Sequence, residues 1–220
     1  MENYKKNLEL LTKNHVYSKE MEHDACGVGL IASTEGKKSR AIVEYGIEAL
    51  KAVWHRGAVD ADGKTGDGAG IHVEIPKDFF IEKIQVTGHD YDNSEICVGM
   101  IFLPRNDYSA QESCKTIVES ELTKNNFSIY GWRQVPVNSK VLGEKALQTM
   151  PEIIQVLFKP NDPNLLDKNL ERKIYEIRKR IENKAFDASL NNFYICSISS
   201  KSIIYKGLYL AEALSDFYLD

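Results

Sequence analysis

The stretch HDACGVGLIAS, residues 23–33, places a cysteine between small residues at the start of an apolar run. A thiol has an ordinary pKa of about 8.5, so at neutral pH it needs a neighbouring base to become a good nucleophile. A chain that starts with cysteine supplies that base itself, because its α-amino group has a pKa of about 8. Cutting between Ala25 and Cys26 creates such a nucleophile. A buried core cysteine and a metal or disulfide cysteine are the alternatives.

The other three cysteines, Cys97, Cys114 and Cys196, lie far apart in the sequence and form no C-x-x-C pair. This spacing does not fit a structural zinc site or a disulfide scaffold. Cys97 lies in EICVGMIFLP and Cys196 in FYICSIS, so we expect both to be buried within strands. We expect Cys114, on a predicted helix, to be inert as well.

The second candidate is HRG, residues 55–57, at the end of a predicted helix. The guanidinium of Arg56 is a rigid fork that can bind a carboxylate with two parallel hydrogen bonds. Gly57 lets the chain turn sharply behind it. The alternative is an exposed arginine that only interacts with the end of the helix.

The third candidate is TGDGAG, residues 65–70. It lacks the Lys-Ser or Lys-Thr of a phosphate-binding P-loop, and its glycine spacing is wrong for a dinucleotide fingerprint. Two interpretations remain open: a tight turn that enters a strand, or a backbone that approaches a ligand closely because glycine permits it. The candidate loop residues are Thr65, Gly66, Asp67 and Gly68.

Helices and strands alternate around these motifs. Periods of about 3.6 residues predict helices, and alternating or continuous apolar runs predict strands. A hairpin is expected across Ser200 and Lys201. The predicted strands are 27–33, 71–75, 96–104, 127–137, 152–158, 191–199 and 202–207, and the predicted helices are 39–55, a short one after Pro76, 106–125, 142–149 and 165–184.

The composition limits the class of protein. Hydrophobic residues make up 43% of the 220 residues, enough for a sizeable core, and the strands and helices predict helices packed on sheets. The net charge of −4 argues against a nucleic-acid partner. No apolar run is long enough to predict a membrane span, and residues 1–22 show no signal-peptide core, so we expect a cytoplasmic protein.

EHDACGVGLIA followed by WHRGAVDADGKTGDGAGIHVEIPKDFF strongly resembles the N-terminal class II glutamine amidotransferase (glutaminase) domain of the glutamate synthase large subunit. YGWRQVPV, MPEIIQVLF and FYICSISSKSIIYKGLYLAEALSDFY are similar to the same family in the same order. The resemblance covers essentially the whole chain from Tyr17.

The resemblance implies an α+β, N-terminal-nucleophile hydrolase fold: a four-layer αββα sandwich of two mostly antiparallel sheets, incomplete here at its C-terminus. It implies that residues 1–25 are a propeptide and that residues 26–220 are part of the amidotransferase domain. It assigns the nucleophile to Cys26 and a role in the substrate pocket to Arg56.

The resemblance also implies a reaction. Glutamine is hydrolysed to glutamate and ammonia through a cysteinyl thioester, and the ammonia passes to 2-oxoglutarate in the complete enzyme. This segment is expected to need no cofactor. FMN and an iron–sulfur cluster belong to the downstream synthase domains, which also work with a small reductase subunit.

The family's downstream Asn-Gly element, which supplies oxyanion donors, has no counterpart in these residues. The isolated piece is therefore expected to be weak or inactive. Two alternatives stay open: a stand-alone N-terminal-nucleophile amidohydrolase acting on another amide, and an inactive remnant in which Cys26 is merely packed.

Overall fold

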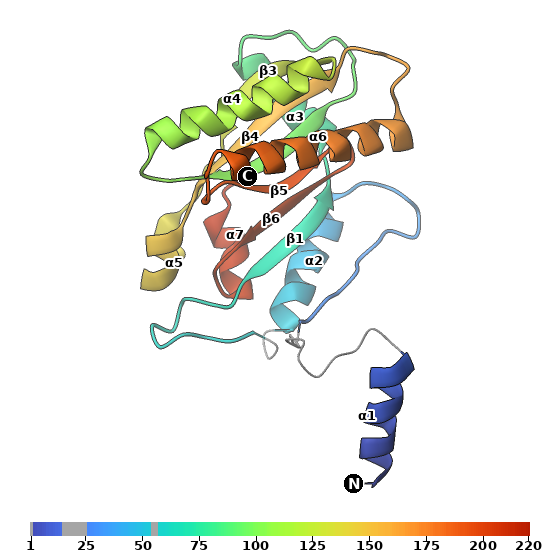
Figure 1. The fold of residues 1–220 in the computed structure, drawn as a ribbon, viewed down its shortest axis with the longest axis vertical. Helices are drawn as coiled ribbons and strands as arrows, with labels where there is room; N and C mark the ends of the chain where they lie inside the picture. The colour runs from blue at the N-terminus through green and yellow to red at the C-terminus, as the bar shows by residue number, and fades with distance from the viewer. Residues whose placement is uncertain (1, 15–25, 54–56) are drawn as a thin grey trace.

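A computed structural model of the protein describes residues 2–14, 26–53 and 57–220. Within these residues the chain folds into strands flanked by helices (Figure 1). The helices are α1 (Glu2–Asn14), α2 (Arg40–Ala52), α3 (Lys77–Val86), α4 (Tyr108–Lys124), α5 (Glu144–Thr149), α6 (Asp167–Asp187) and α7 (Leu214–Phe217), with short 3-10 turns at Ser139–Val141 and Ala211–Ala213. The strands are β1 (Ala69–Glu74), β2 (Cys97–Leu103), β3 (Phe127–Gln134), β4 (Glu152–Pro160), β5 (Tyr194–Ser199) and β6 (Ser202–Gly207).

The larger sheet has four strands in the order β3-β4-β2-β5, and every neighbouring pair is antiparallel. The inner strand β2 is buried along almost its whole length because both faces of the sheet are covered. Cys97 and Ile101 point into one apolar core, and Val98 and Met100 point into the other. This alternation follows from the two-residue period of a strand.

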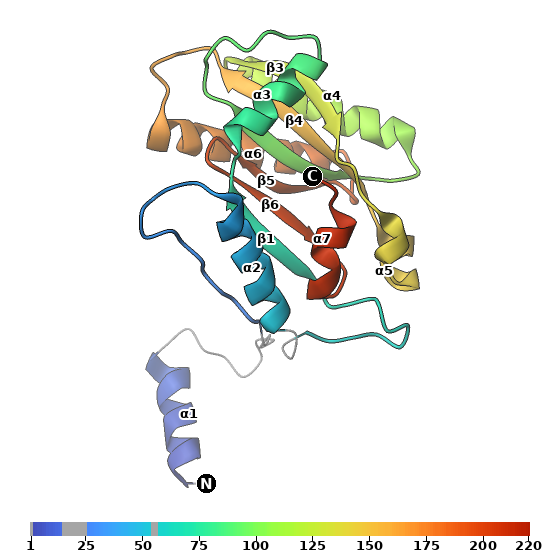
Figure 2. The same cartoon turned by 180° about the vertical axis from the view of Figure 1, so that it is seen from behind.

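Helices α4 and α6 cover one face of this sheet. The apolar stripe of α6 is completely buried there, at Leu170, Ile174, Ile177 and Ile181. The other face packs against α3 and β6 through a second core. Figure 1 shows α4 and α6 in front of the strands, and Figure 2 shows α2 and α3 in front when the molecule is seen from behind.

The smaller sheet consists of β1 and β6, which are antiparallel and in register from Ala69 opposite Gly207 to Glu74 opposite Ser202. Helix α2 packs on β1. Gly46 permits this contact, since a Cβ atom there would lie 3.3 Å from Cδ1 of Ile71. The expected α+β fold with two antiparallel sheets is therefore confirmed, with the sheets between two outer groups of helices.

The predicted hairpin of residues 191–207 is only half right. Both strands form, but β5 pairs with β2 and β6 pairs with β1, so the turn leads from one sheet to the other. β5 and β6 are not neighbours in a sheet, but a side chain connects them: Ile204 N donates a hydrogen bond to Ser197 Oγ at 3.1 Å. The sequence pattern marks two strands and a turn, but it does not specify which partners the strands choose.

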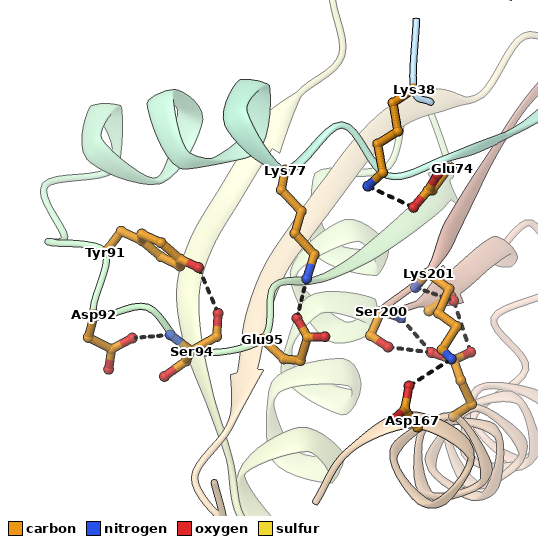
Figure 3. A network of polar contacts seen from close by, with 12 residues as sticks. Lys38, Glu74, Lys77, Tyr91, Asp92, Ser94, Glu95, Asp167, Ser200 and Lys201 are labelled. Carbon is orange, nitrogen blue, oxygen red and sulfur yellow. Dashed lines mark hydrogen bonds and ion pairs between the residues drawn. The ribbon is translucent and has the colours of Figure 1, made fainter. Parts of the chain in front are cut away.

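The turn is fixed by helix α6. The Glu171 carboxylate accepts hydrogen bonds from Ser199 Oγ at 2.9 Å and from both N and Oγ of Ser200 at 2.7 Å. Lys201 forms an ion pair of 3.0 Å with Asp167 at the start of α6 (Figure 3). The turn between the sheets is thus attached to the helix that covers the larger sheet.

Candidate active site

The structure describes all four cysteines, and Cys26 alone among them is exposed. Cys97 lies on β2 and Cys196 on β5, as the sequence predicted, while Cys114 lies on the buried side of α4. A thiol must reach its substrate to act as a nucleophile. Of the four, only the thiol of Cys26 meets that requirement.

The three buried thiols are also chemically quiet. Burial raises the pKa of Cys114 to about 11 and that of Cys196 to about 11, and it raises the pKa of Cys97 well above its usual value. The cause is the loss of water around the charged thiolate. These groups therefore stay protonated at neutral pH, and the reactive form of the thiol is almost absent.

The strand predicted for residues 27–33 is not formed. In the structure this segment has no ladder with the described strands, and the residues Val28 and Leu30 are both 90% exposed. A strand needs a neighbour that accepts its backbone hydrogen bonds, and the apolar pattern alone does not supply one. Five residues beyond this segment, Lys38 forms an exposed ion pair of 2.7 Å with Glu74 at the end of β1 (Figure 3).

Arg56 lies outside the described residues, so its predicted role in the substrate pocket stays a prediction. Gly57, which follows it, is exposed. Figures 1 and 2 place three described parts at the same end of the molecule: the start of the segment 26–38, the end of α2, and residues 57–68 before β1.

The loop between α2 and β1 contains a small hairpin formed by residues 58–67, which we call the 58–67 hairpin. Val59 and Gly66 form an antiparallel bridge. Asp60 N donates to the carbonyl of Thr65 at 2.9 Å, and Asp67 N donates to the carbonyl of Ala58 at 3.3 Å. This pairing brings the residues that follow Arg56 in sequence next to the glycine motif.

The tip of the hairpin is built around the carboxylate of Asp62. It accepts hydrogen bonds from Thr65 Oγ1 at 2.6 Å, from Thr65 N at 2.7 Å and from Lys64 N at 2.9 Å. These donors, with the hydroxyl of Thr65 first among them, hold the pKa of Asp62 well below its usual value. A carboxylate that caps a turn in this way stays ionised at neutral pH.

The predicted loop residues divide into two groups. Thr65 and Gly66 are buried, and a Cβ atom at Gly66 would lie 2.6 Å from the backbone oxygen of Tyr209. The close approach that glycine permits here is therefore to the chain itself, which favours the interpretation as a tight turn. Asp67 and Gly68 are exposed, and Gly68 has a φ of +118° that favours glycine.

Sequence reasoning missed the residues that hold the hairpin: Asp60, Asp62, Gly143 and Lys145. The spacing of Asp62 and Thr65 is typical of a side chain that caps a turn, and could have indicated the tip. No local signal relates them to α5, which is far away in the sequence. A cavity of about 60 Å³ lies between α5 and the end of β6, and within the described ranges no predicted site residue lines it.

The described part of the chain contains no group of three or more His, Cys, Asp or Glu residues that could hold a metal ion. It also contains no helix with the length and apolar character needed to cross a membrane.

The sequence model of the class-II glutamine amidotransferases matches residues 26–220, so that the match begins at Cys26 itself. The chain belongs to this family. The glutamate synthase [NADPH] large chain of Azospirillum brasilense is 53% identical over 217 residues, which are 99% of this chain and 14% of that protein. The resemblance to the glutamate synthase large subunit is therefore confirmed.

Relatives with lower sequence identity are also glutamate synthases. Ferredoxin-dependent glutamate synthase 1 of Arabidopsis thaliana is 40% identical over 201 residues, which are 90% of this amidotransferase chain and 12% of that protein. Ferredoxin-dependent glutamate synthase 2 of Synechocystis is 38% identical over 200 residues, again 90% and 12%. The chain thus spans 12–14% of the length of these relatives.

Proposed function

We propose that this chain is the glutaminase part of a glutamate synthase and that Cys26 is its nucleophile. The main support for the proposal is that two observations point to the same residue. The family match begins at Cys26, and Cys26 is the exposed one of the four cysteines. The similarity to three named glutamate synthases supports glutamine as the substrate.

Activation begins with the removal of residues 1–25. In the uncut chain the nitrogen of Cys26 belongs to the peptide bond with Ala25, and an amide nitrogen is not a base. After the cut it becomes an amine, which accepts the thiol proton directly or through one water. Cys26, the residue that follows the bond to be cut, is exposed.

The reaction is then an acyl transfer. The thiolate of Cys26 attacks the side-chain amide carbon of glutamine, and the amine passes its proton to the nitrogen that leaves as ammonia. The glutamyl thioester is hydrolysed by water, which releases glutamate and restores the thiol. Arg56 binds a negatively charged group of the substrate or supports the pocket, as its planar fork suits a carboxylate.

In the complete enzyme the ammonia reacts with 2-oxoglutarate in downstream domains that carry FMN and an iron–sulfur cluster, with a small reductase subunit as partner. The name of the Azospirillum relative as an NADPH enzyme large chain supports a second subunit of this kind. A cytoplasmic location is supported by the four free cysteines, which are typical of a reducing compartment.

The test is the substitution Cys26→Ala in the full natural protein that contains this chain. Glutamine-dependent glutamate formation should be lost, while synthesis from added ammonium salt should persist, because only the release of ammonia from glutamine needs the thiol. Ser33→Ala, in the same exposed segment, is the matched control and should keep both activities. Glutamine hydrolysis by the Cys26→Ala protein at the normal rate would contradict the proposal.

A further inference from the structure

We propose that the cavity between α5 and the end of β6 is a binding site for ordered water, and that the Tyr209 hydroxyl is the group that holds the water there. We call this space the α5 cavity. The inference goes beyond the proposed function, because no step of the proposed reaction depends on it. It is supported by the size of the cavity, by a buried hydroxyl on its wall, and by the hydrogen bonds of the groups around that hydroxyl.

The α5 cavity is small, with a volume of about 60 Å³. Leu142, Ala146 and Met150 line it on the α5 side, and Gly207 and Tyr209 line it at the end of β6. Figures 1 and 2 both show α5 close to this end of the sheets. An engineered cavity that binds benzene measures roughly 150 Å³, whereas one water needs only about 10–15 Å³ of such space. The α5 cavity can therefore take one or a few water molecules, but not glutamine, which has more atoms than benzene.

The Tyr209 hydroxyl indicates that the cavity binds a polar molecule. Tyr209 is only 1% exposed, and among the buried side chains that the structure describes, its hydroxyl is the polar group without a hydrogen-bond partner. Burial raises the pKa of Tyr209, so the hydroxyl keeps its proton and can both donate and accept. Buried polar groups are almost always paired, and ordered water is the partner where the protein supplies none. The hydroxyl therefore needs a partner that the described side chains do not provide.

The neighbouring polar side chains are already paired with the backbone. Burial is the main cause that raises the pKa of Tyr209 and of Tyr218, and the second cause is the nearby Cys196 for Tyr209 and the nearby Tyr209 for Tyr218. Cys196 Sγ donates to the carbonyl of Ile204 at 3.5 Å, and Tyr218 Oη donates to the carbonyl of Lys206 at 2.9 Å. Neither side chain forms a hydrogen bond with Tyr209 Oη. The cavity is therefore the side from which a partner can come.

The ring of Tyr209 lies along the wall of the cavity. A Cβ atom at Gly207 would lie 2.3 Å from Cε1 of the ring and 3.2 Å from Cζ, the atom that carries the hydroxyl. The ring of Phe217, which also lines the cavity, has its centroid 5.3 Å from that of Tyr209. Two other residues of the wall thus flank the ring, and this position brings the hydroxyl within reach of water in the cavity.

Thr149 supplies a second polar group for the water. It is the last residue of α5, it lines the cavity, and it is exposed, which gives water a route from the solvent. Its hydroxyl donates to the carbonyl of Lys145 at 3.1 Å, and the oxygen keeps lone pairs that can accept from water. A buried water typically makes about three hydrogen bonds. We expect the water to bond to Tyr209 and, directly or through a second water, to Thr149.

The substitution Tyr209→Phe tests the inference, because it removes the hydroxyl oxygen and keeps the ring. Tyr218→Phe is the matched control, since the Tyr218 hydroxyl is also buried but donates to a protein carbonyl. Crystal structures at a resolution that shows ordered water are the direct measurement. The wild-type protein and Tyr218→Phe should show a water within about 3.2 Å of Tyr209 Oη, and Tyr209→Phe should lack it.

Stability in urea gives a second measurement, whose sign depends on whether the hydroxyl is paired. A hydroxyl bonded to water stabilises the folded protein, so Tyr209→Phe should raise the equilibrium constant for unfolding about three- to tenfold, as Tyr218→Phe should. An unpaired hydroxyl would instead make Tyr209→Phe as stable as the wild type or more stable. That result, a wild-type cavity without water at Tyr209 Oη, or a different molecule bound there would each overturn the inference. Neither measurement involves Cys26, so the proposed function is tested separately.

Discussion

Cys26 is set apart by its surroundings. Three thiols of the chain are buried, which raises their pKa, and the fourth is exposed at the start of a segment in which Val28 and Leu30 are exposed as well. The same chemical group, a thiol, is therefore inert in the core at three positions and accessible for reaction at Cys26. The assignment of Cys26 depends on that contrast together with the place where the family match begins.

Thiol labelling at pH 8 should reveal the contrast directly. Iodoacetamide followed by peptide mapping is expected to modify Cys26 within minutes and to leave Cys97, Cys114 and Cys196 unmodified until the protein is unfolded. A pKa of about 11 leaves roughly one thiolate per thousand molecules at this pH, and burial blocks the reagent as well. The labelling of Cys114 and Cys196 should become faster as the pH rises toward 11. Rapid modification of either at pH 8 in folded protein would contradict the burial described here.

Sequence reasoning identified some of the candidate residues but not what holds them. The spacing and types of residues around Cys26 were informative because the relevant chemistry lies within one residue. Asp62 was missed because its partners at the start of α5 are some eighty residues away, and no local pattern reports such a contact. The glycines of the 65–70 motif were recognised, but each lies close to another part of the chain itself. Gly66 lies against Tyr209 and Leu210, Gly68 against Gly207, and Gly70 against Tyr205 and Lys206.

The five predicted helices all form, since a stripe with a period of 3.6 residues reports the buried side of a helix directly, but α1 and α7 were not predicted. In α6 the sequence predicts a stripe of five apolar residues, Leu166, Leu170, Ile174, Ile177 and Ile181, and all but the first are buried. Leu166, at the end of that stripe, is 48% exposed because it precedes the helix as its N-cap. In α2 the sequence predicts a stripe of Ile42, Tyr45, Ala49, Leu50 and Val53. Tyr45 is 57% exposed, and Ile47 packs toward the core instead.

The strands show where the sequence alone is insufficient. An apolar run indicates that a segment can be a strand, but a strand also needs a second strand to pair with. Which strand that is depends on how the rest of the chain folds. Residues 27–33 have the pattern and no described partner, while β5 and β6 have partners in different sheets. The turn between β5 and β6 is consequently the place where the two sheets are joined.

The substitution Glu171→Ala should weaken this join. It would leave the hydroxyls of Ser199 and Ser200 and the N–H of Ser200 without their acceptor, and both serines are at most 8% exposed. Leaving buried donors unpaired costs about 1–3 kcal/mol in the free energy of unfolding. Urea denaturation at unchanged m-value would measure the loss.

Glu176→Ala on the same helix provides the control. Among the described residues Glu176 forms a surface ion pair with Arg172 and no other, so its removal should change the free energy of unfolding by less than about 0.5 kcal/mol. Equal losses in the two variants would show that the turn does not depend on Glu171.

At the scale of the whole molecule, the chain supplies two antiparallel sheets between groups of helices and the family sequence from Cys26 onward. Residues 1–25 precede that match, and they keep the nitrogen of Cys26 in a peptide bond. The relatives are seven to eight times longer than the stretch they share with this chain. The mechanism proposed here therefore assigns one task, the release of ammonia from glutamine, to this part of a larger enzyme.

The most direct test is the mass of the N-terminal peptide in the full natural protein that is active with glutamine. The account predicts a mature chain that begins with Cys26, with a free α-amino group, and no activity in any fraction that retains Met1 to Ala25. Full glutamine-dependent activity in a protein whose N-terminal peptide still contains residues 1–25 would contradict it.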